Sequence, residues 1–98
     1  MSKYTAESQQ RVLKVFDVLF GHEINGLTPS QIAQAVDTSA SNVTRDLANL
    51  KEAGFAEEVM DTGAWRISPR HGRRAVALLH TFERARNEVN NLQDRYTI

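Results

Sequence analysis

The sequence lacks cysteine, long apolar runs and any excess of one charge. The absence of cysteine from its 98 residues excludes disulfides, thiolate metal sites and cysteine nucleophiles, and it is typical of the reducing cytoplasm. No stretch approaches the roughly 20 consecutive apolar residues of a membrane-spanning helix, and the N-terminus has no apolar signal core. We therefore expect a cytoplasmic protein without a membrane partner.

Residues for catalysis or metal binding are also scarce. His22, His71 and His80 are far apart in the sequence, and His80 with Glu83 offers only two ligands one helical turn apart, fewer than a metal site needs. There is no glycine-rich phosphate loop, and no serine lies in a nucleophile motif with a histidine base. We expect no catalytic residue, no metal and no cofactor, and hence no enzyme.

The charges balance, with twelve basic and twelve acidic residues. A net charge of zero counts against nucleic-acid binding, which needs a positive face. The distribution of the basic residues weakens this argument, because Arg66, Arg70, Arg73 and Arg74 are close together in the sequence. The planar guanidinium fork suits both phosphate and guanine.

Hydrophobic periodicity predicts two helices in the first 36 residues. The first covers residues 6–20, with Thr5 as its N-cap and Gly21 as a left-handed C-cap. Its buried stripe consists of Val12, Val15, Phe16, Leu19 and Phe20. The second covers 29–36, with Thr28 and Gln31 forming a capping box and Pro29 in the first helical position.

A third helix begins near Ser39 or Ala40 and ends at 53–54. Val43, Leu47 and Leu50 recur at helical spacing and define its buried face. Only three or four residues separate it from the helix before, and this short turn forces an angled pair.

The next segment has strand character. Residues 55–60 and 64–68 predict a β-hairpin whose turn, 61–63, places Gly63 in a left-handed conformation. Leu27 is expected to form a strand of one or two residues, and Trp65 to pack in the core rather than stack on a base. From 69 or 70 to 93 the chain reads as one long helix.

These residues resemble winged helix-turn-helix domains. The segment 27–36, LTPSQIAQAV, is similar to their second helix. Residues 41–55, SNVTRDLANLKEAGF, resemble the third-helix run of IclR-family and MarR-like regulators. Residues 11–19 resemble the opening of IclR-type domains, and 65–69 the end of their wing. The resemblance covers about residues 10–75.

The resemblance implies a mainly α fold with a small β-hairpin: helix, short strand, helix, helix, hairpin and long C-terminal helix. Residues 1–70 would be the DNA-binding domain and 71–98 a dimerisation helix of one compact domain. No large ligand-binding domain follows the wing in this sequence, so we expect no small-molecule effector. A stand-alone bacterial transcriptional regulator, from a phage or prophage, fits the length.

The helix near 39–53 is expected to enter the major groove of double-stranded DNA, because an α-helix fits that groove and its first residues reach the base edges. Arg45 is equally compatible with contacting a phosphate and with reading a base. The expected DNA contacts are Thr28, Ser39, Ser41, Asn42, Thr44, Arg45, Asn49, Thr62, Gly63, Arg66 and Arg70.

For the wing, the sequence leaves two roles open. Glu57, Glu58 and Asp61 would repel phosphate if they faced DNA, so contact and no contact are both open. For Arg70, Arg73 and Arg74 three roles are open: phosphate contact, a solvated helix face, or pairing with Glu57 and Glu58.

The last helix has apolar residues at alternating three- and four-residue spacing, which is typical of a helix–helix seam. A helix of about 25 residues is about 37 Å long, more than a domain this small covers, so we expect a homodimer; the alternative is a monomer with a frayed end. The seam residues are Leu78, Phe82, Ala85, Val89, Leu92 and Tyr96.

A second function class fits the same fold. Winged helices also bind proteins, so a protein–protein interaction module without DNA binding is the alternative. The neutral net charge and the acidic strand favour it. DNA binding would weaken steeply with salt, and substitution of Arg45 or Asn42 would abolish it.

Overall fold

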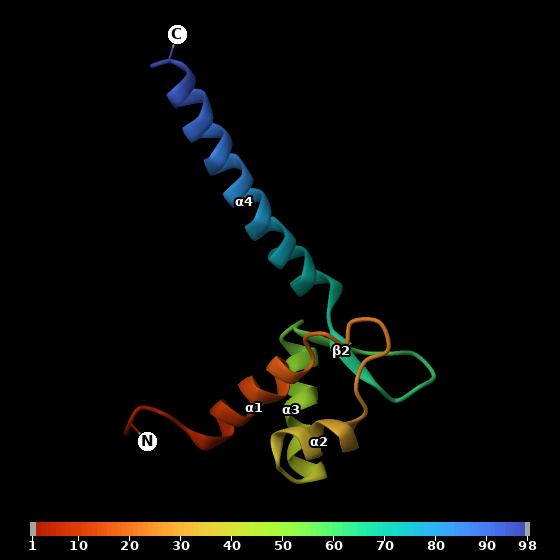
Figure 1. Ribbon diagram of the computed structural model, residues 1–98. Coiled ribbons are helices and arrows are strands. Elements are labelled where there is room, and N and C mark those ends of the chain that lie inside the picture. The colour runs from red at the N-terminus through yellow and green to blue at the C-terminus, as the bar shows by residue number, and fades with distance from the viewer. Residues whose placement is uncertain (1, 98) are drawn as a thin grey trace. The chain divides into compact units, whose positions relative to one another are not determined.

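The computed structural model describes residues 2–97. They form α1 (Glu7–Val18), α2 (Pro29–Val36), α3 (Ala40–Glu52), β1 (Ala56–Glu58), β2 (Trp65–Ile67) and α4 (Pro69–Asp94), in the order predicted from the sequence (Figure 1). The chain divides into two units between Ser68 and Pro69. The second unit thus begins two residues before the boundary assigned from the sequence.

Helix α1 starts and stops within the predicted range. Its N-cap is Ala6, which provides no side-chain hydrogen bond, so the assignment of Thr5 as the cap is wrong. The Thr5 hydroxyl instead donates to the Ser2 carbonyl oxygen at 2.9 Å. The regular helix ends at Val18 with Leu19 as its C-cap, so the assignment of Gly21 as the cap is wrong, although Gly21 has the expected left-handed backbone, at φ +91°.

The capping box predicted for α2 is confirmed, and α3 begins at Ala40 with Ser39 as its N-cap. The Thr28 hydroxyl accepts from the Gln31 amide at 3.3 Å, and the Gln31 side-chain oxygen accepts from the Thr28 amide at 2.8 Å. Asp37, with φ +59°, ends α2 in a left-handed conformation. Ser39 then caps α3 by accepting from the Asn42 amide at 3.2 Å. Both helix starts are therefore fixed by local hydrogen bonds that satisfy otherwise unpaired amides.

The hairpin is shorter than the predicted strands. β1 and β2 pair antiparallel over three residues each, with Glu57 opposite Arg66. Asp61 (φ +68°) and Gly63 (φ +72°) make the turn. Leu27 forms the expected one-residue strand as an isolated bridge to Trp65.

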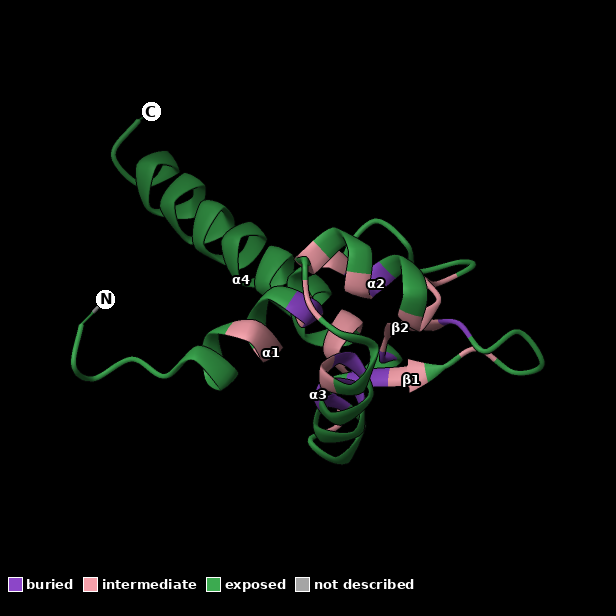
Figure 2. Cartoon of the chain, turned by 90° about the horizontal axis from the view of Figure 1, so that it is seen from below, coloured by how far each residue is buried: buried purple, intermediate pink, exposed green. Residues whose placement is uncertain are grey.

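One hydrophobic core holds the N-terminal unit together where α1, α2, α3 and the hairpin meet (Figure 2). Its buried members are Val15, Leu19, Ile32, Val43, Leu47, Leu50 and Ala56. Trp65 packs against this core, as predicted. The expectation that Phe20 is buried is wrong: it lies beyond the end of α1 and is 44% exposed, with its ring edge-on to Phe16 at 5.2 Å between centroids.

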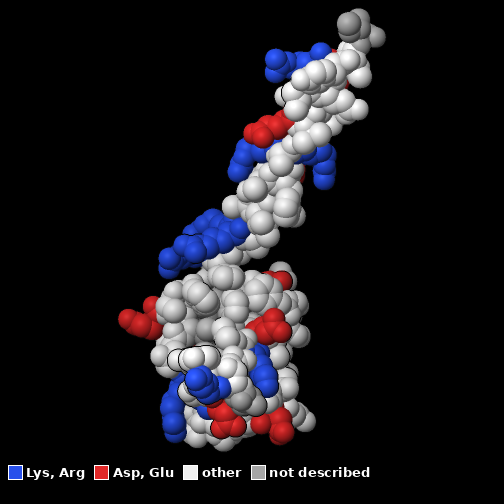
Figure 3. Space-filling view, turned by 90° about the vertical axis from the view of Figure 1, so that its left-hand side faces the viewer, with Lys and Arg blue, Asp and Glu red and all other residues white. Residues whose placement is uncertain are grey.

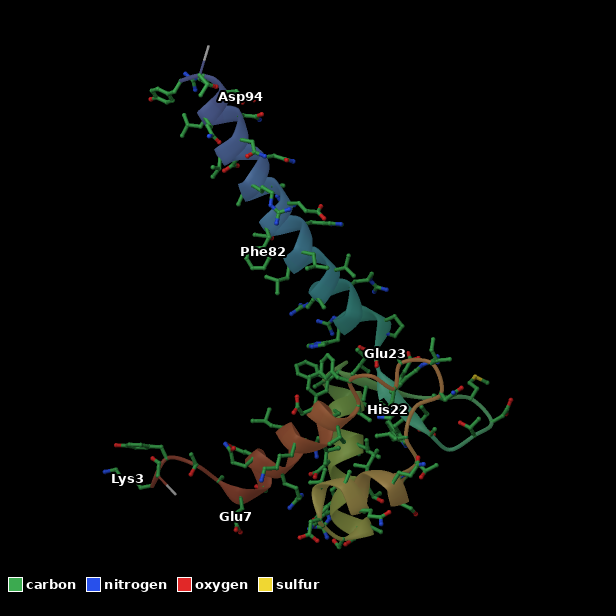
Figure 4. The ribbon with its side chains drawn as sticks, viewed as in Figure 1. Lys3, Glu7, His22, Glu23, Phe82 and Asp94 are labelled. Atoms are coloured by element: carbon green, nitrogen blue, oxygen red, sulfur yellow. The ribbon has the colours of Figure 1, made fainter. Side chains whose placement is uncertain are left out.

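The second unit is the single helix α4, which spans 26 residues and buries none of them. Its length agrees with the prediction. Phe82 projects from the side of the helix (Figure 4). No helix among the described residues is long and apolar enough to cross a membrane.

Candidate nucleic-acid interface

Helix α3 has two faces with different roles. Val43, Asp46, Leu47 and Leu50 are buried against the rest of the unit. The opposite face is exposed and carries short polar groups, one alanine and one arginine: Ser41, Thr44, Arg45, Ala48 and Asn49. The helix is thus anchored on one side and open on the other.

The polar residues of the first turn hold each other in place. The Asn42 side-chain amide donates to the Thr38 hydroxyl at 3.0 Å, and the hydroxyls of Ser39 and Ser41 lie 3.2 Å apart. Asn42 is half-buried. These predicted contact residues therefore lie together at the start of α3, and part of their hydrogen-bonding capacity shapes the turn itself.

In the second turn, one side chain remains open. The Thr44 hydroxyl donates to the Ala40 carbonyl oxygen at 3.0 Å. The Asn49 side-chain amide donates to the backbone carbonyl oxygen of Arg45 at 2.8 Å. The Arg45 guanidinium, in contrast, has no hydrogen bond or ion pair with any residue from 2 to 97. It is the group on this face that can offer several donors to an anion or a base edge.

Sequence reasoning missed the ion pair that anchors α3. Arg11 of α1 donates from Nε to Asp46 Oδ2 at 2.7 Å and from Nη2 to Oδ1 at 2.9 Å. Asp46 is only 3% exposed. The hydrogen bond to Asp46, aided by the charge attraction, raises the pKa of Arg11 above its usual value. A signal existed: Asp46 lies three residues after Val43, on the stripe that Leu47 and Leu50 mark as buried.

Thr28, another predicted contact, lies at the start of α2. Its hydroxyl and amide are both engaged in the capping box, and the residue is half-buried. These hydrogen bonds give Thr28 a structural role in fixing the start of α2.

The charges of the wing, residues 56–67, are largely paired. Arg66 Nε donates to Glu57 Oε2 at 2.9 Å, and Arg66 Nη1 to the Ile24 carbonyl oxygen at 3.2 Å. Lys51 Nζ donates to Glu58 Oε1 at 3.2 Å. Glu57 and Glu58 thus have partners within the N-terminal unit.

The tip of the wing, residues 61–64, has no basic side chain. The Thr62 hydroxyl donates to the Val59 carbonyl oxygen and accepts from the Ala64 amide, both at 3.2 Å. Gly63 follows, exposed. Over residues 2–68 cations and anions are interspersed on the visible surface, whereas cations gather where α4 begins (Figure 3). Arg70, Arg73 and Arg74 are the exposed arginines there.

The predicted seam of α4 runs along an exposed helix face. Its large members are between 51% exposed, at Leu92, and 82% exposed, at Tyr96. A lone helix cannot bury them, so the seam remains a prediction. Within residues 2–97 no three His, Asp or Glu side chains are grouped so that they could hold a metal ion.

These elements define the class of the protein: a bundle of three helices with an angled α2–α3 pair, followed by a β-hairpin, is the winged helix-turn-helix fold. A family model described as "Helix-turn-helix domain" matches residues 7–59. The chain belongs to that family.

Individual proteins agree with this assignment. The HTH-type transcriptional regulator BhcR of Paracoccus denitrificans is 34% identical over 87 residues, which cover 86% of this chain and 30% of the regulator. The chain thus spans under a third of that relative. The structure of an IclR-family transcriptional regulator from Brucella abortus matches with a TM-score of 0.66 at 20% identity, over 82% of this chain and 30% of that one.

A smaller protein shares the fold as well. The ORF112-Zalpha domain of Cyprinid Herpesvirus 3, solved with Z-DNA, matches with a TM-score of 0.54 at 24% identity, over 60% of this chain and 93% of that one. The resemblance to IclR-type winged domains inferred from the sequence is confirmed at the level of the fold.

Proposed function

We propose that this chain is a DNA-binding transcriptional regulator that reads double-stranded DNA with α3. The observation that carries the proposal is the division of α3 into an anchored face and an open one. Asp46 and three apolar residues hold the helix from behind, while Arg45 is exposed with an unengaged guanidinium. A helix held in this way can enter the major groove without rearrangement.

The comparisons support the same reading. BhcR is a transcriptional regulator by name, and the Zalpha domain was solved with a nucleic acid. BhcR also supports a bacterial origin for this chain; a phage or prophage source stays a prediction. The proposed DNA contacts on α3 are those expected from the sequence: Ser39, Ser41, Asn42, Thr44, Arg45 and Asn49.

The proposal includes a homodimer formed through α4. The seam residues lie on one face and are exposed, and a second copy of the helix would cover them. Two copies would present two α3 helices to half-sites about one turn of DNA apart. They would also double the phosphate contacts of a chain whose net charge is zero.

Selection of bound sequences from a random pool of double-stranded DNA tests this function. We expect the purified chain to enrich a motif with two-fold symmetry, because a symmetric dimer reads both half-sites alike. Absence of any enrichment at low salt would overturn the proposal and leave the protein–protein interaction module as the function.

A pair of variants shows whether α3 is responsible. Arg45→Ala should reduce affinity for the enriched duplex at least tenfold, since a charge-assisted contact is lost. Arg84→Ala removes the same charge from α4, away from the predicted seam, and should leave affinity within about twofold. Equal losses in both variants would contradict a reading role for α3 and indicate a nonspecific charge effect.

A further inference from the structure

An open groove lies beside the outward face of α3, between that helix and α1. It measures about 410 Å³. Ser8 and Gln9 of α1 line one side, and Arg45 and Asn49 of α3 line the other. The Arg11–Asp46 pair also lines it, together with Val12. Neither Ser8 nor Gln9 was expected from the sequence to take part in binding.

The groove carries one uncompensated positive charge. The charge of Arg11 is matched by the two hydrogen bonds from its guanidinium to Asp46. Asp46 is the carboxylate among the lining residues, so nothing in the groove neutralises Arg45. A groove with one free cation favours a single anion.

Neutral donors complete the lining. The side chains of Ser8 and Gln9 are exposed, and neither has a side-chain hydrogen bond within residues 2–97. A hydroxyl and a carboxamide can each donate to a phosphate oxygen. The volume accommodates a phosphate group with several waters, since each water occupies roughly 30 Å³ in the liquid.

The position of α1 indicates which anion the groove would bind. The major groove of B-DNA is about 12 Å wide, and a helix with its side chains is about 10–12 Å across. When α3 occupies the groove there is no room for a neighbouring helix beside it. The start of α1 must then meet the rim of the groove, where the sugar–phosphate backbone runs.

We propose that the groove between α1 and α3 holds one backbone phosphate of the duplex. Arg45 supplies the charge, and Ser8 and Gln9 supply neutral hydrogen bonds. This assignment rests on the proposed function and deepens it: Arg45 contacts a phosphate rather than reading a base, and α1 contributes to the interface.

Two duplexes of equal length test the assignment, one carrying the motif enriched in the selection and one of unrelated sequence. Dissociation constants are measured over a series of salt concentrations. Arg45→Gln should weaken binding to both duplexes by a similar factor and lower the slope of log K against log salt by about one. A repeated selection with this variant should return the same motif.

Substitutions on α1 test the neutral contacts. Ser8→Ala combined with Gln9→Ala should weaken binding to both duplexes by about tenfold while leaving the salt slope unchanged, because no charge is lost. Ser8→Asp should weaken both further, since its carboxylate would face the phosphate. Asn25→Asp adds the same charge in the exposed loop before α2 and serves as the matched control. All variants should keep the thermal midpoint of the wild type.

Three results would overturn the phosphate assignment while DNA binding itself stands. One is loss of a guanine from the motif selected by Arg45→Gln. Another is an unchanged salt slope in that variant. The third is wild-type affinity in both Ser8 variants. If the wild-type chain binds neither duplex at low salt, the proposed function itself is wrong.

Discussion

Arg11 and Asp46 are joined by two parallel hydrogen bonds, 2.7 and 2.9 Å long, across the contact between α1 and α3. The two residues are 35 positions apart in the sequence. The carboxylate is buried, while the arginine side chain keeps 23% of its surface exposed. The pair fixes α3 through a charged contact that its apolar residues alone would not specify.

Arg11→Ala should destabilise the N-terminal unit, because it leaves the buried Asp46 carboxylate without a partner. We expect the thermal midpoint to fall by about 5–15 °C, measured by circular dichroism. Arg11→Lys keeps the charge but cannot donate both parallel bonds, so its thermal midpoint should lie between those of the wild type and Arg11→Ala. A midpoint of Arg11→Ala equal to that of the wild type would contradict this role.

The same pair predicts how stability depends on pH. The pKa of Arg11 is raised in the folded state, so its contribution is fully present below the unfolded pKa. It is lost only as the pH rises through the folded value, in strongly alkaline solution. The difference in midpoint between wild type and Arg11→Ala should therefore be the same at pH 7 and pH 9. A difference that shrinks by half over this interval would mean that another group provides the stabilisation.

Gly26 and Gly63 form a matched pair for testing a close backbone approach. Both have φ +72°, but a Cβ on Gly26 would lie 2.6 Å from the Trp65 carbonyl oxygen, whereas a Cβ on Gly63 meets nothing within 4 Å. Gly26→Ala should therefore cost at least about 1 kcal/mol more than Gly63→Ala in the free energy of unfolding. Urea titration of both variants measures the difference; equal costs would show that Leu27 and Trp65 do not approach as described.

The cap of α3 should contribute measurably to stability. Ser39→Ala removes the acceptor of the Asn42 amide and should cost about 1 kcal/mol, and Ser39→Asp should restore most of it. Ser41→Ala, two residues further along and exposed, keeps the Ser39 acceptor of the Asn42 amide and is the control, with a change under about 0.5 kcal/mol. Chemical denaturation of the three variants provides the comparison, and equal effects at both serines would exclude a capping role.

The α4 seam predicts the oligomeric state. Phe82→Asp places a charge on the seam and should raise the dimer dissociation constant by about 100-fold or more. Asn87→Asp adds the same charge off the seam and should leave it unchanged. Analytical ultracentrifugation of both variants tests this. A wild-type chain that is monomeric at the highest measurable concentration would rule out dimerisation through α4.

Features that depend on neighbouring residues were predictable. The capping box of Thr28 and Gln31 and the Ser39 cap each involve positions three apart, so the sequence alone indicates them. The buried apolar face of α3 follows from the spacing of Val43, Leu47 and Leu50. The fold class needed little more than these local signals and the hairpin turn.

Features that depend on distant partners were not predictable. A buried aspartate breaks the rule that core positions are apolar, and its partner lies on another helix. The pairing of Glu57 with Arg66 requires the hairpin register, which the sequence left open. Phe20 was placed in the core because the helix was expected to continue two residues beyond Val18. In each case the missing information is three-dimensional.

The division of α3 into a buried face and an exposed face has a consequence for protein engineering. Neighbours in the sequence alternate between holding the helix and facing outward: Asp46 anchors it, while Arg45 and Ala48 point away from the core. Replacing several outward residues at once leaves every anchoring contact in place. A library randomised at 41, 44, 48 and 49, with Arg45 kept as the proposed phosphate contact, should therefore retain the fold in most members and provide a scaffold for selecting binders to new duplex sequences.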